Sequence, residues 1–273
     1  MRLFGIDFTS APRARKPITI ASAHFDGARL RVTRVDEAPT FDAFDAFLAK
    51  QGPWTGGFDF PFGLPRTLLD ELDWPREARD GDTAWARMVR HVGAMPRAHM
   101  VAAFAAYCDA RPAGSKFAHR PTDLVAGSSP SMKWVNPPVS FMLQAGAPRL
   151  LAAGVCVPGL QPGDAQRVAL EAYPGVLARS VVGRRSYKSD SKATGDREAG
   201  RREIVDAIMA GAMLGLDVTM PARLRAACIA DGSGDCLDAV LCVLQAAWAH
   251  QRRDQRYGLP AQIDPVEGWI VGV

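Results

Sequence analysis

Acidic residues stand inside three apolar segments that are typical of β-strands. Asp7 lies in LFGIDF, Asp59 in GGFDFPFG and Glu171 in VALEAYPG. Asp235 and Asp238 begin an apolar helical pattern, and their spacing places them on one helix face. An unpaired carboxylate is costly to bury, so a group of them needs a neutralising partner. Mg²⁺ and Mn²⁺ prefer oxygen ligands, and such an ion would supply the missing charge.

A divalent-metal site of this kind predicts phosphoryl chemistry. Two ions about 3.5–4 Å apart can activate a water molecule and stabilise the leaving oxygen of an in-line displacement. Each acid also has a structural interpretation. Asp7 and Asp59 suit the caps of the turns that follow them, while Asp235 suits a helix N-cap and Asp238 the first helical turn. The predicted chemistry therefore requires that separate elements converge on one point.

The elements that must position these acids follow from the apolar patterns. Runs rich in β-branched and aromatic residues predict strands at 2–8, 18–25, 30–35, 54–60 and 167–173, the first three as an antiparallel meander. Apolar residues at helical spacing predict helices at 41–49, 201–214 and 222–230, and a long last helix after the turn at 231–234. The chain is therefore expected to have an α/β fold.

Residues 66–166 interrupt this order. They contain helical patches at 85–91 and 99–108, followed by a section rich in Pro, Ser and Gly that runs through Pro137 and Pro138. We interpret residues 66–166 as a mostly helical insertion with long loops, within a single domain that covers residues 1–273. The length is sufficient for a full-sized core.

The net charge of the chain is local. Apolar residues make up 48% and charged residues 23%, which excludes disordered and fibrous classes. The whole chain has a formal charge of +4, with 33 Lys and Arg against 29 Asp and Glu. The segment 184–202, here called the basic segment, has seven basic and three acidic residues, so its excess equals that of the chain. The charge therefore predicts a local contact with phosphate groups.

Other sequence features exclude several kinds of site and location. The five cysteines form no C-x-x-C pair and have no zinc-ligand spacing. Asp7 lies where a signal peptide needs its apolar core, and the apolar run at 208–216 is too short to span a bilayer. We therefore expect a cytoplasmic protein without a membrane partner.

Six motifs distributed from end to end resemble the domain-of-unknown-function 429 (DUF429) family. They are GIDFTSAP at 5–12, GFDFPFGLP at 57–65, EAYPG at 171–175, the pair Tyr187-Lys188, DCLDAV at 235–240 and EGWI at 267–270. Members of that family are regarded as predicted nucleases with an RNase H-like fold, related to RuvC-type resolvases. The resemblance implies a mixed five-stranded sheet, with three antiparallel strands followed by two parallel ones. Helices would flank the sheet, and the insertion would lie between the fourth and fifth strands.

The resemblance also implies roles for the acidic residues. Asp7 takes the position of the first-strand acid, Asp59 that of the fourth-strand acid and Asp238 that of the last-helix acid. We expect Asp7, Asp59, Asp235 and Asp238 to hold Mg²⁺ or Mn²⁺, and Asp7, Asp59, Asp238 and Glu171 to act in catalysis. Two features depart from the resolvase pattern: Glu171 falls on the fifth strand, and Asp59 replaces the common Glu.

Basic and aromatic residues near this site are candidate substrate contacts. Tyr187 and Lys188 would contact a scissile or flanking phosphate, with Arg184 and Arg185 beside them. Lys133, in SSPSMKWVNPP, would line the substrate cleft. The alternative is that the basic segment is a solvated loop and that the stretch around Lys133 packs the insertion onto the core.

Three functional hypotheses follow. The first is a metal-dependent nuclease or phosphodiesterase, acting on nucleic acid or another phosphoester, with a homodimer as one expected assembly. The second is a non-catalytic RNase H-like binding or scaffold protein. The third is an actin-like ATPase or sugar kinase, because GIDFTS is similar to a phosphate-binding strand and turn. Those enzymes duplicate the core, whereas this chain has one copy, which disfavours the third hypothesis.

Overall fold

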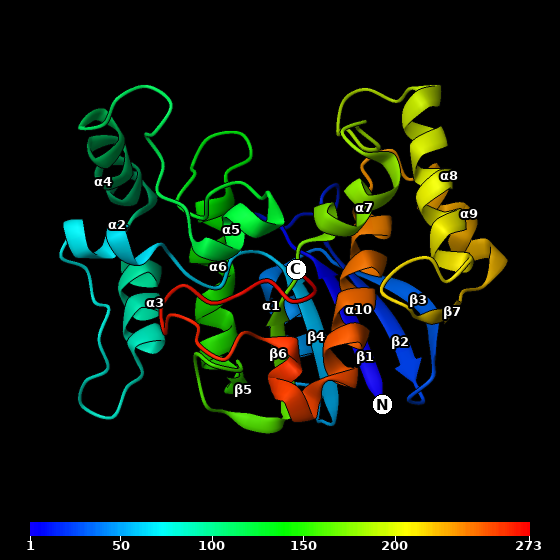
Figure 1. The fold of residues 1–273 in the computed structure, drawn as a ribbon, viewed down its shortest axis with the longest axis horizontal. Coiled ribbons are helices and arrows are strands. Elements are labelled where there is room, and N and C mark those ends of the chain that lie inside the picture. The colour runs from blue at the N-terminus through cyan, green and yellow to red at the C-terminus, as the bar shows by residue number, and fades with distance from the viewer.

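The apolar runs predicted as strands form one mixed sheet of seven strands in the order β5-β6-β4-β1-β2-β3-β7. The computed structural model describes residues 1–273 (Figure 1). The strands are β1 (Arg2–Asp7), β2 (Ile18–Phe25), β3 (Arg29–Ala38), β4 (Trp54–Asp59), β5 (Val155–Cys156), β6 (Asp164–Glu171) and β7 (Asp217–Thr219). The α/β class is confirmed, but the sheet has seven strands instead of five. The edge strands β5 and β7 are too short to show an alternating pattern in the sequence.

The pairing of the central strands places two acids side by side. β1 is antiparallel to β2, and β2 is antiparallel to β3. On the other side, β4 is parallel to β1, and β6 is parallel to β4. Asp7 and Asp59 are direct register partners at the ends of β1 and β4. Successive side chains point to opposite faces, so Ile6 and Phe58 face one side of the sheet and the two acids face the other.

Five helices account for about half of the segment predicted as an insertion. They are α2 (Arg66–Glu71), α3 (Ala84–Ala94), α4 (Arg97–Asp109), α5 (Pro121–Ala126) and α6 (Val139–Ala152). Together with α1 (Phe41–Leu48), α2, α3, α4 and α6 bury aromatic and aliphatic side chains against Phe4, Ile6 and Phe58 of the sheet. Trp134, next to the candidate residue Lys133, packs against this core, with its ring near that of Phe104.

The remaining helices cover the face of the sheet that carries the acids. They are α7 (Pro174–Val182), α8 (Gly195–Met209), α9 (Ala222–Ala230) and α10 (Asp235–Gln251), followed by the 3-10 helix η1 (Arg253–Gly258). α8 begins before the predicted position because Thr194 accepts a hydrogen bond from the backbone N–H of Arg197 at 3.4 Å. The second half of the basic segment is therefore helical instead of a loop.

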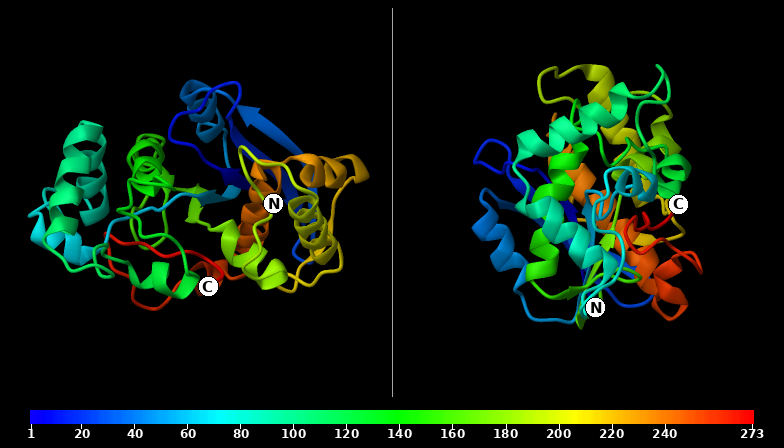
Figure 2. Two further views of the ribbon diagram at one scale, coloured as in Figure 1. Left: turned by 90° about the horizontal axis from the view of Figure 1, so that it is seen from above. Right: turned by 90° about the vertical axis from the view of Figure 1, so that its left-hand side faces the viewer.

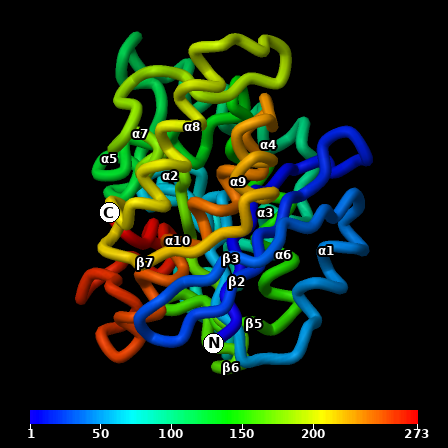
Figure 3. Tube along the Cα trace, turned by 90° about the vertical axis from the view of Figure 1, so that its right-hand side faces the viewer, coloured from blue at the N-terminus to red at the C-terminus, as the bar shows by residue number.

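The layers place α10 directly against the central strands. Figure 1 shows α10 over β1, and Figure 3 shows α10 and α1 on opposite sides of β2 and β3. Seen from above in Figure 2, α2–α4 and α8–α9 lie at opposite ends of the molecule. None of the helices has both the length and the apolar character needed to cross a membrane.

Candidate functional site

Two glycines allow the last helix to lie close to the sheet. A Cβ atom on Gly57 of β4 would lie 2.5 Å from the carbonyl oxygen of Cys242 in α10. A Cβ atom on Gly5 of β1 would overlap the carbonyl oxygen of Ala239. Both glycines precede a strand-ending aspartate by two residues, in GID and GFD. The close approach at these two glycines brings the start of α10 next to Asp7 and Asp59.

Asp238 is fully buried at the start of α10, and two side chains cover it. The hydroxyl of Tyr187 donates to Asp238 Oδ1 at 2.6 Å, and the Lys188 ammonium forms an ion pair with Oδ2. The buried guanidinium of Arg201 holds this segment by donating to the Tyr187 carbonyl at 2.8 Å. Asp238 therefore does not line the open cavity, whereas Lys188 does.

Asp235 lies nearer to solvent and has a different cation. Lys16 Nζ lies 2.9 Å from Asp235 Oδ1 and 2.9 Å from Asp190 Oδ1. Lys16 belongs to the loop between β1 and β2, and no motif in the sequence pointed to it. Of the four predicted metal ligands, Asp235 and Asp238 are thus paired with lysines. The carboxyl groups of Asp7 and Asp59 have no hydrogen-bonding partner.

The site is short of positive charge. Burial raises the pKa of Asp59 to about 7, and the charges of Asp238 and Glu171 act in the same direction against Lys188. Burial also raises the pKa of Asp7 well above its usual range, with further contributions from Asp238 and Asp235. A cation delivered to these two carboxylates would remove this penalty.

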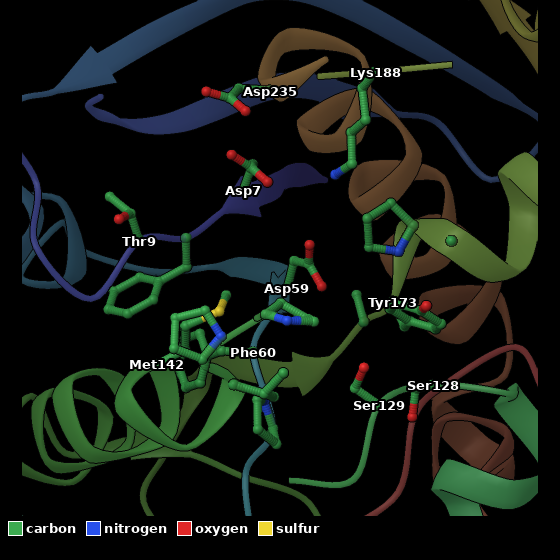
Figure 4. Close-up of a pocket in the computed structure, with 18 of the residues that line it drawn as sticks. Asp7, Thr9, Asp59, Phe60, Ser128, Ser129, Met142, Tyr173, Lys188 and Asp235 are labelled. Carbon is green, nitrogen blue, oxygen red and sulfur yellow. The ribbon is translucent and has the colours of Figure 1, made fainter. Parts of the chain in front are cut away.

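Asp7, Asp59 and Asp235 line a cavity of about 590 Å³ whose walls differ in chemistry. Figure 4 shows Asp7, Asp235 and Lys188 at one end, with the Lys188 amine pointing toward Asp7 and Asp59. Phe60 and Met142 form an apolar wall beside Asp59. The opposite end has the hydroxyl groups of Ser128, Ser129 and Tyr173, among other residues. The cavity volume is typical of a small-ligand site.

The donor chemistry of the site suits a hard divalent cation, but the arrangement suits it only in part. Asp7 and Asp59 offer unpaired carboxylate oxygens on adjacent strands, as Mg²⁺ or Mn²⁺ would require. No group of three His, Cys, Asp or Glu side chains is arranged to hold a metal ion. Asp238 would be the third carboxylate of such a site. The Tyr187 hydroxyl binds one of its oxygens, and the Lys188 ammonium binds the other.

Glu171 has a different environment from the other acids. Its two oxygens accept from the buried guanidinium of Arg120 at 2.6 and 2.9 Å, and Oε2 also accepts from the Phe62 N–H at 3.0 Å. Arg120 also binds Asp123, which is buried as well. Glu171 lines the cavity, and its negative charge raises the pKa of Asp59. Its own oxygens, however, are hydrogen-bonded to Arg120. The predicted catalytic role of Glu171 stays a prediction, while the observed contacts are those of a buried ion pair.

The predicted substrate contacts are brought together only in part. Tyr187, Lys188 and Arg185 line the cavity, but Arg185 also forms an ion pair with Glu203. Arg184 and Lys133 are not among the residues that line it. The structure adds Arg179, whose guanidinium lies 3.1 Å from the Tyr173 hydroxyl at the same cavity. No spacing or motif in the sequence singles out Arg179 or Arg120.

Comparison with known proteins supports one relationship. The family model described as "Protein of unknown function (DUF429)" matches residues 5–264 of the chain. The match includes the end of β1, all of β4 and the start of α10, the elements that carry Asp7, Asp59 and Asp238. No curated protein and no solved structure matches the chain.

Proposed function

The chain belongs to the DUF429 family of proteins of unknown function, and we propose that it is a metal-dependent phosphodiesterase or nuclease. The single observation that carries this proposal is the pair Asp7 and Asp59. Two carboxyl groups without hydrogen-bonding partners lie in direct register and line a cavity. Burial raises the pKa of both carboxyl groups, and a phosphate-bound divalent ion would offset the cost of ionising them there.

An RNase H-like fold is part of the same proposal. Three antiparallel strands, β1 to β3, are followed by β4 and β6, which are parallel to β1. The acids lie at the ends of β1 and β4 and at the start of α10, which are the positions that the resemblance to resolvases implies. β5 and β7 then extend the five-stranded arrangement at its two edges.

Asp7 and Asp59 would hold Mg²⁺ or Mn²⁺, with Asp235 and Asp238 as the nearest further acids. A bound ion would lower the pKa of a water molecule and neutralise charge on the phosphate. Asp59 would hold the ion and accept a hydrogen bond from the attacking water as an ionised carboxylate, since a bound cation would return its pKa from about 7 toward the ordinary range of Asp. Lys188 and Arg185 offer positive charge to the remaining phosphate oxygens. Nucleic acid or another phosphoester is the proposed substrate class, and a homodimer stays a prediction.

Hydrolysis assays with matched variants test this proposal. Purified protein would be incubated with Mn²⁺ or Mg²⁺ and with branched, single-stranded and hybrid oligonucleotides, as well as bis-p-nitrophenyl phosphate. Asp7→Asn and Asp59→Asn should each lower the rate by about a hundredfold or more, because each removes a carboxylate ligand of the ion. Asp217→Asn, in the edge strand β7, is the control and should retain activity. Equal background rates for the wild type and Asp7→Asn would exclude the proposed activity.

A non-catalytic binding protein is the second candidate function. It is favoured by the ion pair between Lys188 and the buried Asp238, which leaves fewer than three acids arranged for one ion. Calorimetric titration separates the two candidates. Absence of Mn²⁺ and Mg²⁺ binding by the wild-type protein, together with no hydrolysis, would favour the binding protein. Metal binding that Asp59→Asn abolishes would favour the enzyme.

A further inference from the structure

We propose that the Lys188 ammonium and a divalent cation compete for Asp238, so that Lys188 sets the affinity of the site for metal. This inference rests on the proposed metal site and describes its regulation. Asp238 is the acid that would serve as a third metal ligand beside Asp7 and Asp59. Its carboxylate does not reach the cavity. Tyr187 covers one of its oxygens, and Lys188 covers the other. An ion could reach Oδ2 only if the ammonium group leaves it.

Lys188 is anchored by its backbone but free at its side chain. The Ser189 N–H donates to the Gly232 carbonyl at 3.0 Å, and Arg201 holds the Tyr187 carbonyl, so both neighbours of Lys188 are fixed. The Lys188 stem passes over Gly234, where a Cβ atom would lie 2.8 Å from Lys188 Cβ. Its side chain remains 41% exposed, whereas that of Asp238 is fully buried. The ammonium can therefore swing into the cavity without unfolding the segment.

The charge around Lys188 also indicates a shared position. The charge of Lys188 lowers the pKa of Asp7 and of Asp59, in addition to forming the ion pair with Asp238. In Figure 4 its amine points toward Asp7 and Asp59. The Lys188 ammonium is thus the positive charge shared by three carboxylates. A divalent ion bound by the same carboxylates would take over this role. A metal ion and the ammonium repel each other, so occupancy by one disfavours the other. In the metal-loaded state, Lys188 would be released into the cavity, where it can contact a phosphate.

The experiment compares metal affinity in variants that differ in this one charge. Mn²⁺ titrations by calorimetry would use the wild type, Lys188→Met, which keeps the stem, and Lys116→Met, an exposed lysine, as the control. Lys188→Met should bind Mn²⁺ about tenfold or more tightly than the wild type, which is within the usual range of coupling between sites. Lys116→Met should match the wild type.

A second measurement uses the wild-type protein, in case Lys188→Met does not fold. Acetylation of lysines would be followed residue by residue by mass spectrometry, with and without Mn²⁺. Displacement predicts that Mn²⁺ raises the labelling rate of Lys188 several-fold and leaves Lys116 unchanged. Labelling of Lys188 that is unchanged or reduced by bound Mn²⁺ overturns the inference.

The outcomes separate this inference from the proposed function. If the wild type binds Mn²⁺ and Lys188→Met binds no more tightly, the competition is excluded and the metal-dependent activity stands. If only Lys188→Met binds Mn²⁺, the competition is supported and the wild type is not a metal enzyme. If neither binds Mn²⁺, both proposals are excluded.

Discussion

Asp7 and Asp59 lie directly opposite each other on the parallel strands β1 and β4, and neither carboxyl group has a hydrogen-bonding partner. Elsewhere at the site, acids are matched with bases: Asp235 with Lys16 and Asp238 with Lys188. The unpaired acids face a cavity, which is where a cation and a phosphate could both enter. This contrast between paired and unpaired acids is the feature from which the proposed function follows.

The close contact between β4 and α10 should depend on Gly57. Gly57→Ala places a methyl group 2.5 Å from the Cys242 carbonyl oxygen and 3.3 Å from Ala172 Cβ, so α10 must shift. We expect a loss of about 1–3 kcal/mol in the free energy of unfolding. Gly195→Ala, which has open space around it at the start of α8, is the control and should have little effect. Urea denaturation of both variants checks this, and equal stability would mean that the interface is more tolerant than its geometry indicates.

The hydrogen bond from Tyr187 should contribute to holding Asp238. Tyr187→Phe removes a donor at 2.6 Å from a fully buried carboxylate, so the free energy of unfolding should fall by about 1–3 kcal/mol. Tyr257→Phe, at a half-buried position in the otherwise exposed η1, removes a hydroxyl without such a partner and should be near neutral. Thermal and chemical denaturation measure the difference. A neutral Tyr187→Phe variant would show that Lys188 alone satisfies Asp238.

The metal-free protein should lose stability as the pH rises from about 4 to about 7. The pKa of Asp59 is raised from 3.8 to about 7 in the folded protein, so the folded state binds the proton more tightly than the unfolded state. Its contribution is therefore present at low pH and disappears as Asp59 ionises. Unfolding free energies measured across this range, without metal, should decline less steeply in Asp59→Asn. An identical slope in Asp59→Asn and the wild type would contradict the assigned pKa.

Arg120 should be essential for stability. It is almost fully buried and neutralises Glu171 and Asp123, which are buried too. Arg120→Met leaves both carboxylates without their cation and should cost about 3–5 kcal/mol. Arg202→Met breaks an exposed pair with Glu198 and should cost less than about 1 kcal/mol. Denaturation curves test the contrast, and a mild Arg120→Met variant would mean that Glu171 and Asp123 do not need the charge of Arg120 in order to be buried.

Local patterns in the sequence were enough to locate most of the central strands and several helices. β2 and α9 have the predicted bounds. β1 and β4 begin at the predicted residues and each end one residue earlier than predicted. α1 begins at the predicted residue, where the Thr40 side chain accepts a hydrogen bond from the Ala43 N–H and caps the helix through near neighbours in the chain. The two-residue edge strand β5 and the early start of α8 were not predicted, because neither has a long periodic pattern.

The partners of the acidic residues were decided by the tertiary structure. The sequence by itself determined which residues are acidic and placed Asp7 and Asp59 on strands and Asp238 at a helix start. Lys188 reaches Asp238 across 50 residues, and Arg120 reaches Glu171 across 51. Such contacts depend on how elements far apart in the chain pack, and no spacing rule encodes them. Only the folded chain therefore distinguished the paired acids, Asp238 and Glu171, from the unpaired Asp7 and Asp59.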